Sequence, residues 1–408
     1  MDQAQQQNQR QGLRRALGTP LLTLYGLGVI IGAGIYVLIG SVIDAAGGVA
    51  PWSFVLAGLL AGLTGLSYAE LAVRYPEAAG AAAYVKEAFR SDRLAQLVGL
   101  AVALVVITST ASIARGSVGY LQEFVDWPTT VIAGGMVVIF TVIACFGVRE
   151  SIGFAALMTL IELGGLLLVL AAGWPDPGAI AERAHEIVPA AELKVWAGIA
   201  GGAFLAFFAF IGFENLANMA EEARAPERSL PRALLLSLAI STALYAAVAV
   251  VTVLAAPLAE LAGSAAPLML VAERASWFSA DVFAAIALIA VANGVLIELV
   301  TLARLLYGMA RRGWLPDTLG TVHPSTQTPV KATLCGGLIV FVLAVVLPFL
   351  SLVSLTNSIT LLVFAMVNAA LWRLQQVAPR QSGFRVPRAI PPLAIILTLA
   401  LAGAQWVQ

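Results

Sequence analysis

Residues 25–36 read YGLGVIIGAGIY and lie within an apolar segment, residues 19–43, that is long enough to span a bilayer. Three small residues, Gly32, Ala33 and Gly34, fall close to the middle of this segment. A Gly-x-Gly pattern also occurs in dinucleotide-binding motifs, but those need a strand, a turn and a helix in a water-soluble domain, so that interpretation is excluded. For this segment alone, two interpretations stay open: close helix packing through small side chains, or an unwound stretch whose free backbone groups bind a ligand.

A second stretch, residues 207–215, reads FFAFIGFEN and again places a glycine, Gly212, near the middle of an apolar segment, residues 196–223. The two segments are the first and the sixth in the chain, so each begins a set of five. Interrupted apolar segments at matching positions of two halves are typical of a transporter site, and an odd number of helices per half gives the halves opposite topology. The pair therefore favours unwinding and predicts inverted repeats.

The overall composition predicts an all-α integral membrane protein. Of the 408 residues, 60% are hydrophobic and 11% are charged, and the mean hydropathy is +0.91, whereas water-soluble domains carry roughly 25% charged residues. The net charge is zero, so nothing predicts a nucleic-acid partner. The lipid bilayer is the expected surrounding, and about eleven transmembrane helices are predicted at 19–43, 51–74, 95–121, 129–148, 152–173, 196–223, 233–256, 280–310, 330–349, 351–373 and 388–406.

Positive charge is distributed unevenly over the loops. Of the 23 Lys and Arg residues, 18 fall in the N-terminal tail and the alternate loops on its side, and 3 fall in the loops on the other side. Because loops rich in Lys and Arg stay in the cytoplasm, this predicts a multi-pass protein of the inner (cytoplasmic) membrane with a cytoplasmic N-terminus. The predicted organisation is a tail at 1–18, five-helix repeats at 19–173 and 196–373, and an eleventh helix at 388–406.

Paired breaks suit a zwitterionic substrate. An amino acid must leave water to enter a pocket at mid-membrane depth, so both of its charges need partners there. The free N–H groups at the start of a half-helix can bind its carboxylate with a favourable dipole, and unwound carbonyl groups can accept from its ammonium. Such a site needs no charged side chain.

Three motifs also carry a family resemblance. Residues 28–40 (GVIIGAGIYVLIG), residues 207–231, and residues 304–316 (RLLYGMARRGWLP) with 322–324 downstream resemble the helix 1, helix 6 and helix 8 signatures of the amino acid–polyamine–organocation superfamily of permeases. Bacterial relatives of cationic amino acid transporters look most similar. The resemblance implies a LeuT-like 5+5 inverted-repeat fold with discontinuous helices 1 and 6. It also implies a secondary active transporter of amino acids, a symporter or an exchanger, that works by alternating access.

The resemblance further implies a substrate site at the two breaks. The substrate carboxylate would meet the backbone N–H groups of Ala33 and Gly34, and the ammonium would meet carbonyl groups of both breaks. Phe208 or Phe210 would form an aromatic gate, and Glu214, which follows the second break, would cap or brace it and act in gating. The expected substrate-binding residues are Ile30, Gly32, Ala33, Gly34, Phe208, Ala209, Phe210 and Ile211.

The chain departs from the family pattern at two acidic residues. Glu162, in the middle of segment 152–173, stands where proton-coupled relatives often have a lysine, and Glu298 stands where many relatives have a neutral residue. A carboxylate at this depth costs roughly 2.5–3.5 kcal/mol, so it should be protonated, paired or bound to a cation. We expect Glu162, with Glu298 and Thr301, to form a proton or sodium site beside Gly28 and Ile31. The alternative for Glu298 is a purely structural role, in which it pairs with Arg304 or accepts a hydrogen bond from its neighbours.

Other function classes fit less well. A channel would favour continuous pore-lining helices, an enzyme would need a nucleophile with a base or a metal cluster, and a sensor would be supported by large soluble domains. No other potential metal ligand lies at a suitable sequence spacing from His185 or His323. No metal is therefore expected apart from sodium at Gly28, Ile31 and Glu162. No other cofactor is expected. An amine or polyamine exchanger of the same fold stays an alternative, and the oligomeric state is left open.

Overall fold

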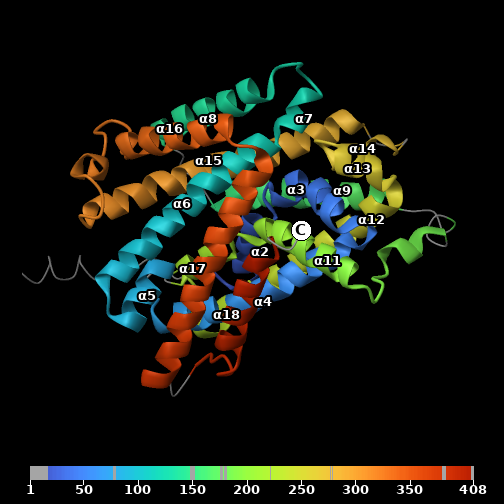
Figure 1. The fold of residues 1–408 in the computed structure, drawn as a ribbon. Helices are drawn as coiled ribbons and strands as arrows, with labels where there is room; N and C mark the ends of the chain where they lie inside the picture. The colour runs from blue at the N-terminus through green and yellow to red at the C-terminus, as the bar shows by residue number, and fades with distance from the viewer. Residues whose placement is uncertain are drawn as a thin grey trace, which may run out of the picture.

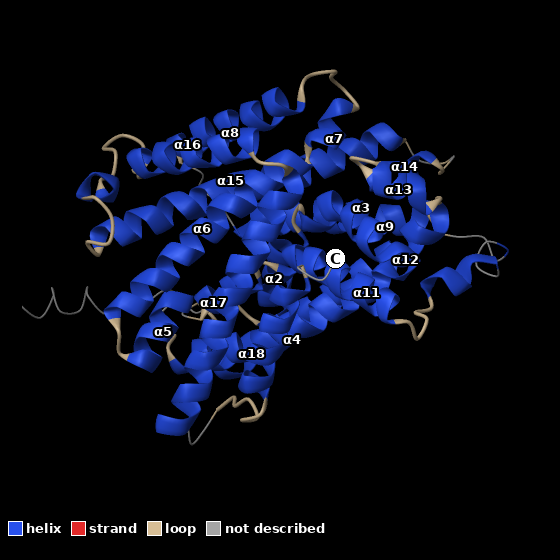
Figure 2. Cartoon of the chain, in the orientation of Figure 1, coloured by secondary structure: helices blue, strands red, loops and turns tan. Residues whose placement is uncertain are grey.

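The computed structural model describes residues 17–76, 80–147, 152–174, 178, 182–220, 222–275, 277, 279–378 and 383–405. Within these ranges every regular element is a helix, and there is no strand (Figures 1 and 2). Most of the predicted N-terminal tail, residues 1–18, lies outside the described residues. The all-α prediction is therefore confirmed for the part of the chain that can be seen.

The apolar helices fall where the sequence predicts them. Seven helical stretches of the described chain are long and apolar enough to cross a membrane, and four shorter apolar helices complete the set. The helices that correspond to the eleven predicted segments are α2 (Thr19–Ile31) with α3 (Gly34–Ala46), α4 (Ala50–Arg74), α6 (Asp92–Gly116), α8 (Thr129–Phe146), α9 (Ile152–Ala172), α11 (Leu193–Ala206) with η3 (Phe207–Phe210) and η4 (Phe213–Met219), α12 (Pro226–Ala255), α15 (Ala280–Arg311), α16 (Val330–Val346), α17 (Phe349–Val377) and α18 (Ile390–Ala404).

Short elements connect these helices. They are η1 (Gly47–Val49), α5 (Ala81–Phe89), α7 (Val118–Gln122), η2 (Ala184–Ile187), α13 (Leu258–Gly263), α14 (Pro267–Glu273) and η5 (Asp317–Gly320). Helix ends differ from the predictions by a few residues, for local reasons. For example, α8 ends at Phe146 rather than 148 because Gly147 adopts a positive φ of 86° that stops the helix.

The long helices form two groups that are joined by two further helices. In the first group α2, α3, α4, α11 and α12 pack on one another, and in the second α6, α8, α15 and α16 do so (Figure 1). Helix α9 packs on both α2 and α15, and α17 packs on both α4 and α6. Shifting each helix by five positions in the set of ten maps each group onto itself. The same shift maps the contacts of α9 with α2 and α15 onto those of α17 with α11 and α6. This is the exchange that a LeuT-like 5+5 inverted repeat implies.

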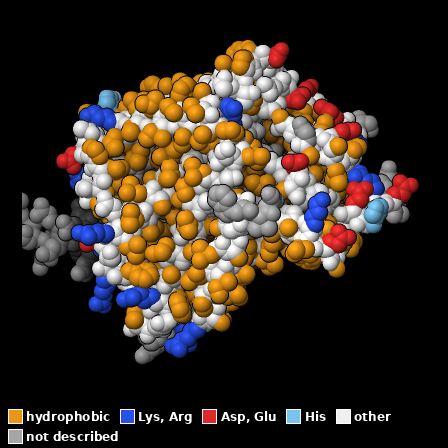
Figure 3. Space-filling view, viewed as in Figure 1, with side chains coloured by type: hydrophobic (Ala, Val, Ile, Leu, Met, Phe, Trp, Pro, Cys, Tyr) orange, Lys and Arg blue, Asp and Glu red, His pale blue; other side chains and the backbone are white. Residues whose placement is uncertain are grey.

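Charged side chains separate toward opposite ends of the molecule. In Figure 3, Lys and Arg side chains gather along the left and lower edges, while most of the visible Asp and Glu side chains lie at the right. Between the two ends the visible surface is largely hydrophobic, as the outer face of a bilayer-embedded helix bundle must be. The end rich in Lys and Arg is the one that the loop charges predict to be cytoplasmic.

Candidate substrate and coupling sites

The first break separates α2 from α3 at Gly32 and Ala33. Gly32 has φ +26° and ψ −148°, a conformation that suits glycine because a side chain would be strained there. Helix α3 restarts at Gly34, so the first N–H groups of its opening turn have no carbonyl one turn earlier in the helix to bond. No other heavy atom among the described residues lies within 4 Å of the position a Cβ would take at Gly32. The space beside Gly32, two residues before the start of α3, is therefore open.

The second break interrupts helix 6 at Ile211 and Gly212. After α11 the chain tightens into the 3₁₀ turn η3, Ile211 turns to an extended ψ of 137°, and Gly212 adopts φ +118°. The carboxylate of Glu214 accepts a hydrogen bond from the Gly212 N–H at 2.9 Å. The side chain that was expected to cap or brace this break does form the capping bond.

The two breaks press directly against each other. A Cβ added to Gly34 would lie 2.7 Å from the Ala209 Cα, and one added to Gly212 would lie 2.5 Å from the Val29 carbonyl oxygen. Both distances are too short for a real side chain, so each glycine is required by a close backbone approach. Ala33, Gly34, Phe208, Ala209 and Phe210 are all buried.

A tyrosine that the sequence did not single out joins the breaks. The hydroxyl of Tyr245, on α12, lies 2.9 Å from the Ile30 carbonyl oxygen, 3.3 Å from that of Ile31 and 3.1 Å from that of Ala209. Two of these carbonyls are the acceptors expected for the substrate ammonium, while the Phe208 carbonyl accepts from the Ile211 N–H at 3.2 Å. Each carbonyl has a second lone pair for a ligand. No pattern in the sequence near Tyr245 predicts this role, because Ile30 and Ile31 lie more than 200 residues away in the chain.

The two phenylalanines considered as gates face different helix groups. Phe210 is fully buried and its ring meets the Tyr245 ring edge-on, with centroids 5.2 Å apart. Phe208 packs instead in the apolar cluster that contains Ala33, Val291 and Val295, where the first group of helices meets α15. Phe208 therefore lies at the boundary between the groups, as a gate must, whereas Phe210 is part of the packing around Tyr245.

Glu162 is buried on α9, with 1% of its surface exposed. One carboxylate oxygen accepts from the Asn293 side-chain amide at 3.0 Å, and the other finds no hydrogen-bond partner among the described residues. The backbone carbonyl of Glu162 accepts from the Tyr36 hydroxyl at 2.7 Å, which links it to α3. Glu162 thus connects α9, α15 and the outer half of helix 1.

The other residues expected at the coupling site are only partly gathered around Glu162. Gly28 lies against Thr159, one turn before Glu162 on α9, and the Ile31 carbonyl faces Tyr245. Thr301 is half-buried on α15. Helix α9 packs on α2 as expected, but α15 packs mainly on α6, α9 and α16 and reaches helix 1 at the break, where Gly294 lies near Ala33.

Glu298 does not share a site with Glu162. Its carboxylate accepts from the Ser109 hydroxyl on α6 at 3.0 Å, which is a hydrogen bond of the kind that the structural alternative expects. The other form of that alternative, an ion pair with Arg304, is not among the ion pairs that the described residues form. Asn293 and Glu298 are five residues apart on α15, and this spacing turns their side chains about 140° apart.

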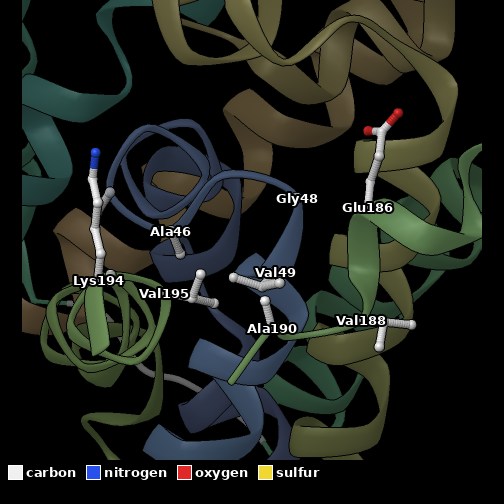
Figure 4. A pocket seen from close by; sticks show the side chains of 10 residues that line it. Ala46, Gly48, Val49, Glu186, Val188, Ala190, Lys194 and Val195 are labelled. Carbon is white, nitrogen blue, oxygen red and sulfur yellow. The ribbon is translucent and has the colours of Figure 1, made fainter. Parts of the chain in front are cut away.

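Two cavities lie near the ends of the bundle rather than at the breaks. One, of about 360 Å³, lies between the end of α3 and the start of α11, with Glu186 and Lys194 at opposite sides of an apolar lining (Figure 4). Arg183 and Glu186 form a two-bond ion pair at its rim, at 2.8 and 2.9 Å. The other, of about 510 Å³, lies at the opposite end, beside Arg304.

Comparison with known proteins gives a consistent result. The model of the amino acid permease family matches residues 17–407. The branched-chain amino acid permease BcaP of Bacillus subtilis is 30% identical over 95% of this chain and 88% of its own length. The vacuolar cationic amino acid transporter 2 of Arabidopsis thaliana is 30% identical over 93% of this chain, which spans 62% of that protein's length. Among solved structures, a manganese transporter of Eremococcus coleocola shares the fold, with a TM-score of 0.58, 14% identity, and coverage of 95% of this chain and 86% of that one.

Proposed function

The chain belongs to the amino acid permease family, and on this premise we propose that it is a secondary active transporter that moves an amino acid across the cytoplasmic membrane by alternating access. The observation that carries the proposal is the pair of apposed breaks. At their junction the space beside Gly32, two residues before the start of α3, is open, and carbonyls of Ile30 and Ala209 converge within hydrogen-bond distance of a single hydroxyl. Donors for a carboxylate and acceptors for an ammonium are thereby placed side by side.

The proposed substrate is a neutral, apolar amino acid. The wall next to the breaks is formed by Phe208, Val291 and Val295, which offer no charge to a substrate side chain. Glu214, the acidic residue nearest the second break in sequence, already holds the Gly212 N–H. The name of the Bacillus relative, a branched-chain amino acid permease, points the same way.

We further propose that Glu162 carries the coupling cation, and that this cation is a proton. A buried carboxylate with one unpartnered oxygen is costly unless it is neutralised. A proton neutralises it with no further ligand. Sodium would need several converging oxygens, and the contacts of Gly28 and Ile31 run to Thr159 and Tyr245 rather than to Glu162.

The test is uptake into liposomes that contain the purified protein. Labelled leucine, isoleucine, valine, alanine, lysine and putrescine would be offered under an imposed proton gradient and, separately, under a sodium gradient. Saturable uptake of an apolar amino acid that is driven by protons alone is the expected result. Sodium-driven uptake would overturn the proton assignment, and preferred uptake of lysine or putrescine would overturn the proposed substrate.

If the protein is an obligatory exchanger, one further experiment is needed to detect its transport. Liposomes preloaded with unlabelled amino acid would then take up label without any gradient. Failure of both gradient-driven uptake and exchange, in protein that stays folded and inserted, would contradict the transporter proposal itself.

A further inference from the structure

The cavity at the Lys- and Arg-rich end is not used by the transport site. It lies between the end of α8, the stretch of α15 from Val300 to Arg304, about two to three turns before the end of that helix, and the loop that leads into α16. Its volume of about 510 Å³ is large enough for a phosphate group and its attached glycerol. The breaks at Gly32 and Gly212 are not among the residues that line it.

Arg304 supplies the charge in this cavity. Its side chain is exposed, and it takes part in none of the ion pairs found among the described residues. No acidic side chain is among the described residues that line the cavity. A positive group that has no counter-charge among those residues, in a hollow at the membrane edge, attracts an anion.

The opposite wall is a fixed polar loop. Thr328 donates from its hydroxyl to the Cys145 carbonyl at 2.7 Å, and its own carbonyl accepts from the His323 N–H at 2.8 Å. The hydroxyls of Thr326 and Thr328 lie 2.7 Å apart. The loop is therefore held against the end of α8, and its hydroxyl and amide groups line the hollow that faces Arg304.

The outer faces of α8 and α16 carry an apolar surface from this cavity into the membrane region. Phe146, which lines the cavity, is 72% exposed. Further exposed apolar side chains on the two helices are Val131, Val138, Ile139, Val142, Ile143, Leu334, Leu338, Ile339, Val342 and Val346. Figure 3 shows this hydrophobic surface along the upper edge of the molecule, where Figure 1 places α8 and α16.

We propose that the cavity binds the phosphate group of an anionic phospholipid from the leaflet at the Lys- and Arg-rich end. The phosphate faces Arg304, opposite the polar loop, and the acyl chains run along the apolar faces of α8 and α16. This orientation places the phosphate charge at the membrane interface and the acyl chains in the bilayer. A soluble phosphate has no acyl chains and could not contact the apolar faces of the helices. The site belongs to the second group of helices, so a bound lipid would brace α8, α15 and α16 together.

The test measures lipid retention directly. Purified protein would be stripped of lipid, offered phosphatidylglycerol or phosphatidylcholine in detergent micelles, and examined by native mass spectrometry. The expected result is one tightly retained phosphatidylglycerol, with little retention of phosphatidylcholine. Arg304→Gln should weaken retention roughly fivefold, and Arg304→Lys, which keeps the charge, should weaken it less.

Arg311→Gln is the matched control, because Arg311 lies at the same end of α15 but does not line the cavity. Equal losses in Arg304→Gln and Arg311→Gln would mean that only general charge attraction operates, and would overturn the site. A thermal shift in 10 mM inorganic phosphate that equals the shift with phosphatidylglycerol would overturn the lipid as the source of the phosphate. Each variant would be checked for a single monodisperse species, so that unfolding cannot be mistaken for lost binding.

Discussion

Glu70 and Glu162 are both buried carboxylates on transmembrane helices, and they differ in how completely they are partnered. Glu70 is 0% exposed, and both of its oxygens are used: one by the Arg74 guanidinium, the other by Gln375 at 3.1 Å and by the Val386 N–H at 2.7 Å. Glu162 is 1% exposed, and a single amide at 3.0 Å serves one of its two oxygens.

The contrast separates a structural acid from one that is available for chemistry. Four described donors fix the charge of Glu70, so protonation would break contacts that join α4, α17 and the segment before α18. Glu162 can take up or release a cation at its free oxygen without losing its bond to Asn293. Two buried residues of the same type thus differ in function because they differ in their donors.

The largest predicted effect is a loss of stability at Glu70. In Glu70→Gln one oxygen becomes an amide nitrogen, which would face donors in either orientation: Arg74 on one side, or Gln375 and the Val386 N–H on the other. Breaking one side of a buried charged pair costs about 3 kcal/mol or more. The apparent melting temperature in detergent, followed by size-exclusion chromatography after heating, should fall by several degrees. A melting temperature equal to that of the wild type would contradict a structural role for Glu70.

The second effect is a loss of coupling at Glu162. Glu162→Gln keeps the size of the side chain and the acceptor for Asn293, so folding should change little. Without an ionisable group, gradient-driven uptake should fall roughly tenfold to 100-fold, the usual range of a coupling energy. Exchange of internal for external substrate, which needs no net cation flow, should persist.

The matched control for this experiment is Glu298→Gln. Glu298 also lies on a transmembrane helix, but it accepts from Ser109 and not from Asn293. We expect its gradient-driven uptake to stay within about fivefold of the wild type, because a weakened hydrogen bond changes a free energy by only about 1 kcal/mol. If the effects of the two variants were reversed, the coupling role would belong to Glu298.

Tyr245 extends the comparison to a neutral group, with an intermediate expected effect. Tyr245→Phe removes the hydroxyl that positions carbonyls of both breaks, at a cost of about 1–2 kcal/mol. If these carbonyls must be held in place to receive the substrate ammonium, the KM for uptake should rise roughly fivefold. A lower KM would mean the opposite, that the hydroxyl competes with the substrate for its acceptors.

The sequence predicted the helices and both breaks because these follow from local signals. Apolar length predicts a span, and a glycine at mid-span, repeated in the sixth segment, predicts where the backbone unwinds. Opposed Gly34 and Ala209 could only be suspected from the family resemblance. Tyr245 could not be predicted at all, because what matters is the position of one hydroxyl relative to carbonyls far away in the chain.

The partners of the acidic residues were also out of reach of the sequence. Glu162 and Glu298 are the same residue type at a similar predicted depth in the membrane. This depth alone suggested that they form one coupling site with Gly28, Ile31 and Thr301. Helix rotation decides otherwise, since it turns Asn293 toward Glu162 and Glu298 toward Ser109. The structural role of Glu70 was not predicted, because Glu70 lies close to the end of its span, where an acidic residue does not stand out as unusual.

The smallest predicted effect is at Glu186, which is well partnered but lies at the membrane edge. Its ion pair with Arg183 has 24% of each side chain exposed, so Glu186→Gln should cost less than about 1 kcal/mol. Hydrogen bonds from Arg183 lower the pKa of Glu186 below its ordinary value. Because the folded-state pKa is the lower one, the stabilisation is complete above the unfolded-state pKa of about 4.3 and disappears as the pH falls through the folded-state value. Melting temperatures of wild type and variant should therefore differ slightly at pH 7 and converge in acid. A difference at pH 7 as large as that of Glu70→Gln would show that the paired arginine, and not burial, determines how much a carboxylate stabilises this fold.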